Sequence, residues 1–388
     1  MSFYIMDILR YLFWIFLAVI AYVYLGYPLL IFLLSKIFSK EVRKAPIEPS
    51  VSILISAYNE AGQIGKTLEN KLGLDYPAGK VEILVISDGS TDGTEEVVRR
   101  YSERGVRLYR QEPRAGKTAA LNFAVPQATG EILVFSDANS IYEREALRKL
   151  VKNFSDPKVG YVTGKMIYAN PDGTVSGEGC STYMKYENLI RRCETRVGSI
   201  VGVDGGIDAA RKSLYQSMRP DLLPDFVLPL RVVEQGYRVV YEPEAILREE
   251  ALASSSDEYR MRVRVSLRAF WALHEMKQLL NIFAHGFYSI QLVSHKILRY
   301  LAFVFLGLVY LFNLGLLTAG PLYQALFAIQ TLFYLCSALG YYTQRRGKGS
   351  RLLSVPFYFI LVNLACAHAF LKFLRGTRQA VWSPRTRG

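Results

Sequence analysis

Long apolar runs alternate with segments of mixed polarity along this chain, and the longest uncharged run comes first. Residues 11–35 contain no charged side chain, and about 20 apolar residues are enough for a helix to cross a bilayer. Three more apolar runs follow near 300–318, 322–342 and 352–371. The pattern predicts one N-terminal and up to three C-terminal membrane spans. A cleaved signal peptide is the alternative for the first run, but that run is too long and lacks a small-residue cleavage site.

Shorter apolar runs, of strand length, occupy the region from about residue 50 to 255. Strands are predicted near 51–56, 81–87, 106–110, 132–135, 159–164 and 237–242. Helical spacing of apolar residues separates the first four of them. Strands that alternate with helices indicate an α/β domain with a mostly parallel, doubly wound sheet.

Arginines interleave with apolar residues over 257–285, which is typical of a helix that lies on a membrane surface. A helix packed on the α/β domain is the alternative. We therefore divide the chain into an N-terminal span and linker (1–45), the α/β domain (46–256), interfacial helices (257–296) and C-terminal spans with a basic tail (297–388). One N-terminal and three full C-terminal spans would leave the basic tail outside the cell, against the positive-inside rule. Pro356 and Asn363 make the last run the expected irregular one.

The 388 residues carry a net charge of +13, and the excess lies mostly near the apolar runs. Lys36, Lys40, Arg43 and Lys44 follow the first run, so the positive-inside rule places the α/β domain in the cytoplasm. Anionic lipid headgroups and phosphates explain this distribution better than nucleic acid does. The four cysteines show no metal-binding spacing, and we expect them to be reduced.

Polar residues that suit a nucleotide site follow three of the predicted strands. Asp137 and Asn139 come directly after the fourth strand, and turns at 57–62 and 88–93 follow the first two. Ligands of open α/β sheets bind at the carboxyl ends of the strands. An Asp close to an Asn offers oxygens for a ribose hydroxyl and for a hard cation such as Mg²⁺. A turn with an Asx hydrogen bond is the alternative at this position.

Six segments in order carry a family resemblance: 56–60, 88–93, 116–117, 137–139, Asp225 with residues 230–231, and Arg262 with Arg264. Together they resemble the membrane-embedded family 2 glycosyltransferases, which include cellulose, chitin and hyaluronan synthases and many bacterial exopolysaccharide and lipid glycosyltransferases. The resemblance covers most of the chain. It implies a GT-A fold, a nucleotide-sugar donor such as a UDP-sugar, Mg²⁺ or Mn²⁺, and inversion at the anomeric carbon.

The resemblance also implies site residues. Asp137 and Asn139 would hold the metal, although an amide oxygen holds a cation less tightly than a carboxylate does. The residues expected to bind the donor are Ala57, Tyr58, Glu60, Asp88, Gly89, Lys117, Asp137, Arg262 and Arg264. A core position for Tyr58, a turn-forming role for Asp88 and headgroup binding by the two arginines are the alternatives.

Asp225 is the candidate general base. Its apolar neighbours Leu223, Phe226 and Val227 would desolvate the carboxylate partly, which makes it a better proton acceptor. A helix N-cap after Pro224 is the alternative, and Pro224 stands where the family has Glu.

The resemblance leaves the product open. Met261 and Val265 stand where polymer-extruding synthases have Gln and Trp, which favours transfer of single sugars to a lipid-linked or saccharide acceptor in a bacterial or archaeal membrane. Trp382 faintly resembles the C-terminal tails of hyaluronan synthases, so processive synthesis stays open. A nucleotide-sensing membrane scaffold would leave Asp225 unexplained, and a nucleotidyltransferase should carry a Gly-rich basic loop at 57–62.

Overall fold

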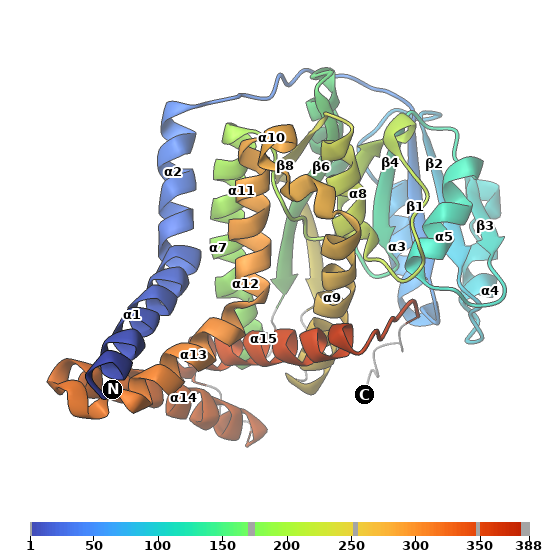
Figure 1. Cartoon of the computed structure of the whole chain (residues 1–388). Coiled ribbons are helices and arrows are strands. Elements are labelled where there is room, and N and C mark those ends of the chain that lie inside the picture. The colour runs from blue at the N-terminus through green and yellow to red at the C-terminus, as the bar shows by residue number, and fades with distance from the viewer. Residues whose placement is uncertain (1, 170–174, 251–254, 347–349, 382–388) are drawn as a thin grey trace.

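The computed structural model of the chain describes residues 2–169, 175–250, 255–346 and 350–381. One α/β domain lies beside and above a set of long apolar helices (Figure 1). Its strands form a single sheet in the order β3-β2-β1-β4-β7-β6-β8-β5. The strands are β1 (Val51–Ala57), β2 (Val81–Ser87), β3 (Val106–Arg110), β4 (Ile132–Asp137), β5 (Ile141–Tyr142), β6 (Val159–Ala169), β7 (Asp208–Arg211) and β8 (Arg238–Glu250).

The first four strands are parallel to one another, which confirms the predicted α/β sheet. Every residue of β1 is buried, because helices cover both faces of a parallel sheet and both sets of side chains must therefore be packed. The register pairs Ser56 with Asp137 and Ala57 with Ser87. The carboxyl ends of β1, β2 and β4 therefore meet at one edge of the sheet.

The second half of the sheet is mixed, and sequence patterns predicted it less well. Strand β7 is antiparallel to β4 and β6, and β5 is antiparallel to β8, whereas β6 and β8 are parallel and longer than predicted. Neither β5 nor β7 was predicted. Each is short and gains its conformation from its pairing partners rather than from its own sequence.

Helices pack on both faces of the sheet. Ile64 of α3, Val98 of α4 and Leu150 of α6 lie in one core, while Leu121 of α5 and Val227 of α8 lie in the core on the opposite face. The helices up to α8 are α1 (Ser2–Ala21), α2 (Tyr27–Ile37), α3 (Ala61–Leu72), α4 (Thr94–Arg99), α5 (Lys117–Ala124), α6 (Ala146–Val151), α7 (Val175–Val197) and α8 (Pro224–Glu234). The helices after it are α9 (Ser255–Glu275), α10 (Ile282–His285), α11 (Phe287–Leu292), α12 (Leu298–Tyr300), α13 (Ala302–Gly315), α14 (Pro321–Arg345) and α15 (Arg351–Leu374).

Helix α9 lies between two layers rather than at a free surface. Ala269 and Ala272 pack into the core of the α/β domain, and Leu267 and Phe270 pack against Ala365 of α15. Helix α9 is therefore covered by protein on two faces, and the prediction that residues 257–296 lie at a membrane surface stays a prediction. Its apolar positions are distributed on two faces, which a simple count of interleaved arginines does not reveal.

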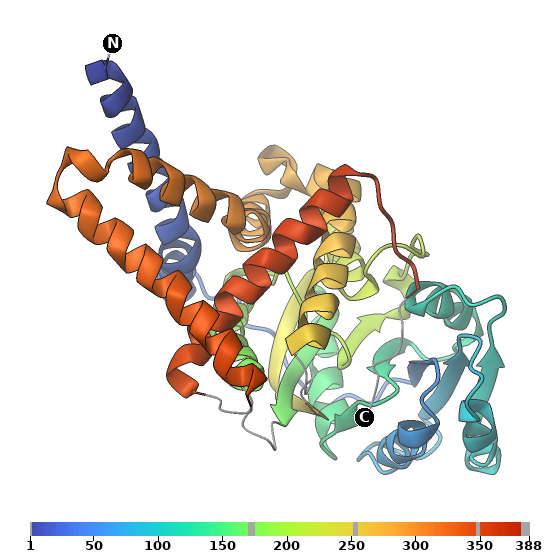
Figure 2. The ribbon, with the colours of Figure 1, turned by 90° about the horizontal axis from the view of Figure 1, so that it is seen from below.

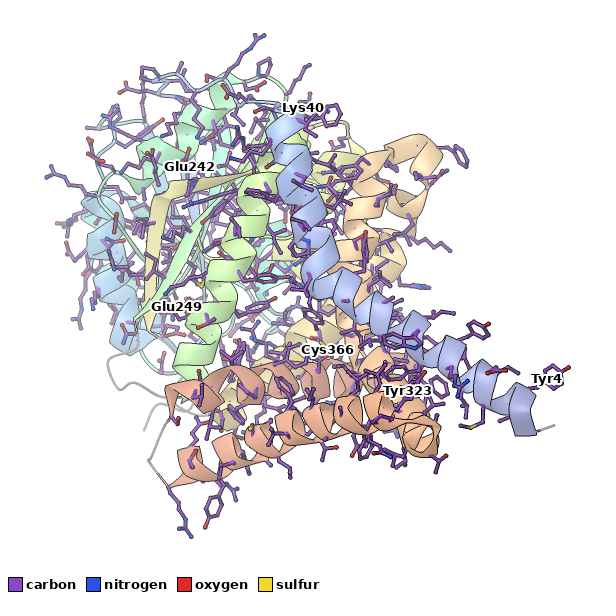
Figure 3. The ribbon with its side chains drawn as sticks, turned by 90° about the vertical axis from the view of Figure 1, so that its left-hand side faces the viewer. Tyr4, Lys40, Glu242, Glu249, Tyr323 and Cys366 are labelled. Carbon is purple, nitrogen blue, oxygen red and sulfur yellow. The ribbon has the colours of Figure 1, made fainter. Side chains whose placement is uncertain are left out.

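The N-terminal apolar run forms one long helical segment. Helices α1 and α2 join through a π-helical turn at Tyr22–Gly26, and Tyr4–Ile37 is long and apolar enough to cross a membrane. The segment extends beyond the predicted 11–35 at both ends. Figure 3 shows the segment running between Tyr4 and Lys40, with Tyr323 beside its N-terminal half. Phe13 of that half and Tyr323 share a small apolar cluster.

Two later helices within the described residues, at Pro321–Arg345 and Leu352–Leu374, pass the same test. A fourth candidate is the pair Phe287–Tyr300 and Ala302–Gly315, which is bent by 60°. The irregular segment is therefore this pair, and the prediction that placed it at Pro356 is wrong. Pro356 lies inside the continuous helix α15. The end of α14 and the start of α15 cross, and the two helices diverge beyond that point (Figure 2).

The C-terminal tail returns to the α/β domain. Trp271 Nε1 donates a hydrogen bond to the Thr377 carbonyl at 2.8 Å, and the Arg378 guanidinium lies 4.0 Å over the Trp271 ring. The Ala380 carbonyl lies against Gly116, where a Cβ would overlap it. The tail therefore lies on the same side of any membrane as the α/β domain, and the expected conflict with the positive-inside rule does not arise. Trp382 lies outside the described residues.

Candidate active site

A cleft of about 580 Å³ opens at the carboxyl edge of the parallel strands. It is bounded by the ends of β1 and β4, the starts of α5 and α8, one face of α9, and the end of α15 with the tail. Of the predicted site residues, those that line it are Tyr58, Glu60, Lys117, Asp137, Asn139, Asp225 and Arg264. The cleft thus gathers seven residues that are spread over some 200 positions of sequence.

One ammonium group joins the two carboxylates in the centre of the cleft. Lys117 Nζ lies 2.8 Å from Asp137 Oδ1 and 3.2 Å from each carboxylate oxygen of Asp225. The carboxylate of Asp225 is 22% exposed and that of Asp137 is 36% exposed, so both are accessible from the cleft. Asp137 and Asp225 are therefore close enough to act on a single bound molecule.

Burial alone would lower the pKa of the Lys117 ammonium. The neighbouring carboxylates of Asp137 and Asp225 outweigh burial, and they hold this pKa well above its ordinary value. Lys117 is therefore a permanent positive charge at any physiological pH. A fixed cation at this position suits the stabilisation of a negatively charged group that enters the cleft.

Secondary structure fixes each of the three side chains. Asp137 is the last residue of β4, Lys117 is the first residue of α5 after Gly116, and Asp225 follows Pro224 in the first turn of α8. Leu223 is the N-cap residue of α8, so Asp225 is not the cap that the alternative interpretation required. The positive end of the α8 dipole favours the ionised form of a carboxylate in its first turn.

Two glycines let the backbone pass close to both carboxylates. Gly205 and Gly206 have φ values of +78° and +75°, which residues with a side chain adopt rarely. A Cβ on Gly205 would lie 2.9 Å from Asp225 Oδ2, and one on Gly206 would lie 3.5 Å from Asp137 Oδ2. The close approach of this turn is thus directed at the two aspartates. Asp204 itself is buried in an ion pair with Arg191 at 2.5 Å.

Helix α9 contributes basic residues to the cleft wall. Arg260 and Arg264 line the cleft together with Arg268, which is buried. Burial, followed by the charge of Arg264, lowers the pKa of Arg268 to about 10. Arg268 donates hydrogen bonds to Thr118 Oγ1 and to the Leu222 carbonyl, so it ties the start of α8 to α5. Sequence reasoning did not single out Arg268, although it belongs to the same run of arginines.

Arg262 does not line this cleft, and its predicted contact with the donor needs correction. Its Nε donates to Glu258 Oε1 at 2.8 Å, and its guanidinium contacts Tyr358 of α15. Residues two apart on an α-helix are separated by about 200° around the axis. Arg262 and Arg264 therefore face opposite sides of α9, and only Arg264 reaches the cleft.

The turns after β1 and β2 support the cleft rather than line it, apart from Tyr58 and Glu60. Ala57 and Asp88 are fully buried. The Asp88 carboxylate accepts hydrogen bonds from the backbone N–H groups of Ala115 at 2.8 Å and Gly116 at 2.9 Å. Gly89 forms the turn, with φ +71°. In this structure Asp88 therefore positions the loop before α5, and Ala57, Asp88 and Gly89 are not among the residues that line the cleft.

An aromatic residue and an arginine meet at one end of the cleft. The Arg114 guanidinium stacks 3.3 Å from the centre of the Tyr58 ring. This contact covers one face of the Tyr58 ring. Arg114 was not predicted, because only the fold of the loop that Asp88 holds brings it to Tyr58.

The residues present suit a cation that is shared with a phosphate ligand. No group of three or more His, Cys, Asp or Glu side chains positioned for a metal ion occurs among the described residues. Asp137 offers one accessible carboxylate, and Asn139, whose Nδ2 donates to Glu249 at 3.0 Å, lines the cleft beside it. Mg²⁺ is commonly held by one or two protein oxygens with substrate phosphates and water. Asp137 and Asn139 fit that arrangement and not a closed protein cage.

Comparison with known proteins shows which protein family has a domain similar to the one that carries the cleft. A profile described as Glycosyl transferase family 2 matches residues 52–211, which run from β1 to the end of β7. The chain carries a family 2 glycosyltransferase domain. The fold of this domain is GT-A. The residues that the profile matches include the carboxyl ends of β1, β2 and β4, which form the sheet edge described above.

Several bacterial and archaeal proteins are similar to this glycosyltransferase. Poly-beta-1,6-N-acetyl-D-glucosamine synthase of Staphylococcus aureus is 31% identical over 203 residues, which are 50% of this chain and 48% of that protein. The synthase of Staphylococcus epidermidis is 27% identical over 242 residues, covering 59% and 58%. The chain thus spans about half the length of these curated relatives.

A solved structure extends the similarity to the membrane helices. The mannosyltransferase PcManGT from Pyrobaculum calidifontis, in complex with GDP-Man and Mn²⁺, gives a TM-score of 0.69 with 25% sequence identity. The match covers 91% of this chain and 99% of that one. The arrangement of the GT-A domain with flanking apolar helices is therefore shared with a known transferase.

Proposed function

We propose that this glycosyltransferase transfers a sugar, with inversion, from a nucleotide sugar to a lipid-linked or glycan acceptor at the cytoplasmic membrane face, in the synthesis of a cell-surface polysaccharide or glycolipid. The observation that carries the proposal is the cluster of Lys117, Asp137 and Asp225 in one cleft of a family 2 domain. A scaffold that only senses nucleotides would not require the second carboxylate.

The donor diphosphate would lie between the end of β4 and α9. Lys117 and Arg264 supply positive charge on two sides of that space, and Arg264 offers the planar fork that matches phosphate oxygens. The bound GDP-Man of the Pyrobaculum structure supports a nucleoside diphosphate sugar as donor. A UDP-sugar follows from the family resemblance, so GDP-mannose and UDP-N-acetylglucosamine are the first two donors to compare.

A divalent cation would be held by Asp137 and Asn139 together with the donor phosphates. Bound there, Mg²⁺ or Mn²⁺ supplies a Lewis acid that neutralises charge on the leaving diphosphate. The Mn²⁺ of the Pyrobaculum complex supports this assignment. In the structure the Asp137 carboxylate forms an ion pair with the Lys117 ammonium, so Lys117 places a positive charge beside this carboxylate.

Asp225 would act as the general base. Its carboxylate takes the proton from the acceptor hydroxyl while the acceptor oxygen forms a bond to the anomeric carbon and the bond to the diphosphate breaks on the opposite side. One displacement of this kind inverts the anomeric configuration. Lys117 orients the carboxylate through hydrogen bonds of 3.2 Å to both oxygens. Gly205 leaves the space that the carboxylate occupies.

The division of the chain follows from this proposal. Residues 1–45 anchor the protein, residues 46–256 bind the donor, residues 257–296 connect the domain to the membrane, and residues 297–388 provide further membrane helices and a tail. The basic residues after α2 support a cytoplasmic position for the glycosyltransferase domain. Bacterial relatives support a prokaryotic cell membrane as the location.

The test is the release of nucleoside diphosphate by the purified full-length protein. A panel of UDP- and GDP-sugars is supplied with Mn²⁺, with Mg²⁺ or with chelator, in the presence of membrane lipid extract. We expect release from one donor class, dependent on a divalent cation and increased by the extract. Nucleotide binding without release from any donor would overturn the transferase and favour the sensing scaffold.

A processive synthase is the second candidate, because the curated relatives are polysaccharide synthases by name. A processive synthase differs from a single-sugar transferase in the length of its product. Labelled donor and gel filtration of the product measure that length directly. Val265 lies where a polymer-extruding enzyme has Trp, and it presents a small aliphatic side chain to the cleft at that position. We therefore expect a single added sugar.

A further inference from the structure

A second cavity lies on the other side of α9, among the membrane helices. Its volume is about 360 Å³, which is within the range of small-molecule sites. Its walls come from the π-turn of the N-terminal helix, α7, α9, the segment 295–300 and α15. Val265 lines both this cavity and the cleft, so one helix separates the two. The reaction proposed above does not use this space, and Arg262 and Val265 are the residues of the family motifs that line it.

The cavity is open toward the helices that could cross a membrane. Tyr24, Arg299 and Tyr358 come from three different candidate spans, and Val355 on the rim of the cavity is 50% exposed. Figure 3 shows Cys366, another lining residue, on α15 below the N-terminal helix. Most of the lining is aromatic or aliphatic, which suits a hydrocarbon chain more than a soluble ligand.

Two of the three cations in the cavity have acidic partners. Arg299 forms an ion pair with Glu187 and stacks over Tyr186 at 5.0 Å. Arg262 pairs with Glu258 at 2.8 Å. Each of these positive charges is neutralised within the protein.

Lys296 is the exception. It is partly buried and lines the cavity, yet it makes no hydrogen bond or ion pair within the part of the chain that the structure describes. Gly202 makes room for its ammonium group, because a Cβ there would overlap it. The nearest acids, Glu187 and Glu194, are occupied by His295 at 3.1 and 2.7 Å, and Glu187 also by Arg299.

Two tyrosine hydroxyl groups add to the polar lining, which also includes Thr182, Ser266 and Asn363. Tyr183 and Tyr300 both line it, and neither hydroxyl has a hydrogen-bond partner among the described residues. A partly buried ammonium that forms no direct ion pair is costly, and a bound anion offsets that cost. One ammonium with two hydroxyl donors matches the oxygens of a phosphate group.

We propose that this cavity binds the phosphate group and adjoining chain of a membrane lipid, with Lys296 as the counter-charge of the phosphate. The aromatic walls hold the first part of the hydrocarbon chain, and the remainder extends between the membrane helices. The lipid phosphate then lies one helix away from the catalytic cleft. The site does not depend on which donor, if any, the cleft uses.

The test measures binding of dodecyl phosphate to the full-length protein in a non-ionic detergent by native mass spectrometry. Dodecanol carries the same chain without phosphate, and inorganic phosphate carries the group without a chain. We expect a complex with dodecyl phosphate that is at least tenfold more populated than either control complex. Binding of inorganic phosphate to the same extent would show a soluble anion site instead and would overturn the lipid assignment.

Variants locate the site. Lys296→Met should lower dodecyl phosphate binding at least tenfold. Lys277→Met, which removes a lysine at an exposed position, should leave this binding unchanged. Val362→Trp fills the cavity from α15 and keeps the charge, so it provides a second disruption that does not depend on folding around Lys296. Unchanged binding in Val362→Trp, or in a Lys296→Met protein with a wild-type circular dichroism spectrum, would contradict the proposal.

Discussion

At the scale of single residues, the cleft depends on which way each charged side chain faces. Lys117 and Arg264 face the space between Asp137 and Asp225, whereas Arg262 faces the second cavity. The end of the strand at Asp137 was predictable, because an apolar run stops there in polar residues. The rotation of α9, which separates Arg262 from Arg264, was not predictable, since it is set by packing against both the domain and α15.

The two arginines form a matched pair for mutation. Arg264→Met should weaken binding of nucleoside diphosphate about tenfold or more, because a charge-assisted hydrogen bond contributes about 1.5–3 kcal/mol. Arg262→Met should leave that affinity unchanged and lower the thermal unfolding midpoint, because it leaves the buried Glu258 without its cation. Isothermal titration and thermal unfolding in detergent measure both effects. Equal loss of affinity in the two variants would contradict the assignment of faces.

Asp208 is a buried carboxyl group beneath the cleft that sequence patterns did not indicate. It is fully buried on β7 beside its cross-strand partner Thr163. Burial, followed by the negative charge of Asp225, raises the pKa of Asp208 well above its ordinary value. The folded state therefore keeps a proton that the unfolded chain releases near pH 4, and stability falls as the pH rises above that value.

Asp208→Asn should remove this pH dependence. The amide is neutral at every pH, so the variant should gain stability relative to the wild type as the pH rises, by up to about 1.4 kcal/mol per pH unit within the window. Unfolding midpoints at pH 5 and pH 8 measure the effect. A constant difference between the two proteins at both pH values would show that the folded protein holds no extra proton on Asp208 in this range.

At the scale of elements, the parallel half of the sheet was predictable and the rest was less so. Strands β1 to β4 are apolar runs of the right length between polar turns, and each was predicted. The four residues of β7 carry a charge at both ends and pair only because β4 and β6 flank them. Helix α7 lacks a long apolar face and was not predicted. The cleft could be assembled from strand ends, whereas its α9, α15 and tail walls required the fold.

The tail is the element whose role is simplest to test. Residues 377–381 lie across the start of α5 and contribute Gln379 to the cleft. Deletion of 377–388 should raise the KM for the donor several-fold with little change in the unfolding midpoint, because none of the described residues 377–381 belongs to a core. Arg378→Ala should also raise the KM for the donor, because it breaks the ion pair between the tail and Asp221 at 2.8 Å. An unchanged KM in both variants would show that the tail does not shape the donor site.

At the scale of the whole molecule, the structure links the long apolar helices and the glycosyltransferase domain into one unit. The chain leaves the domain through α9, passes through α13 to α15, and returns to the domain with its tail (Figure 1). Sequence hydropathy alone left the side of the tail undecided, because it counts apolar runs and does not show where their ends make contact. The contact between Ala380 and Gly116 supplies that information.

Labelling of engineered cysteines tests this arrangement. Glu103→Cys in the domain and Gln379→Cys in the tail, each in a chain with Cys336→Ser, should react with a membrane-impermeant maleimide from the same face of oriented vesicles. Both sites should be labelled in inside-out vesicles and protected in right-side-out vesicles. Labelling from opposite faces would contradict the return of the tail to the domain.

The proposal as a whole rests on the separate roles of Asp225 and its neighbours, and one measurement addresses it most directly. Asp225→Asn should lower transfer by about 10²–10⁴-fold, the usual contribution of a general base, while nucleoside diphosphate and Mn²⁺ bind as in the wild type. Asp257→Asn, which removes another carboxylate from the cleft wall, is the matched control and should keep most of the activity. Loss of nucleotide binding together with transfer in Asp225→Asn, or transfer at the wild-type rate, would contradict the account.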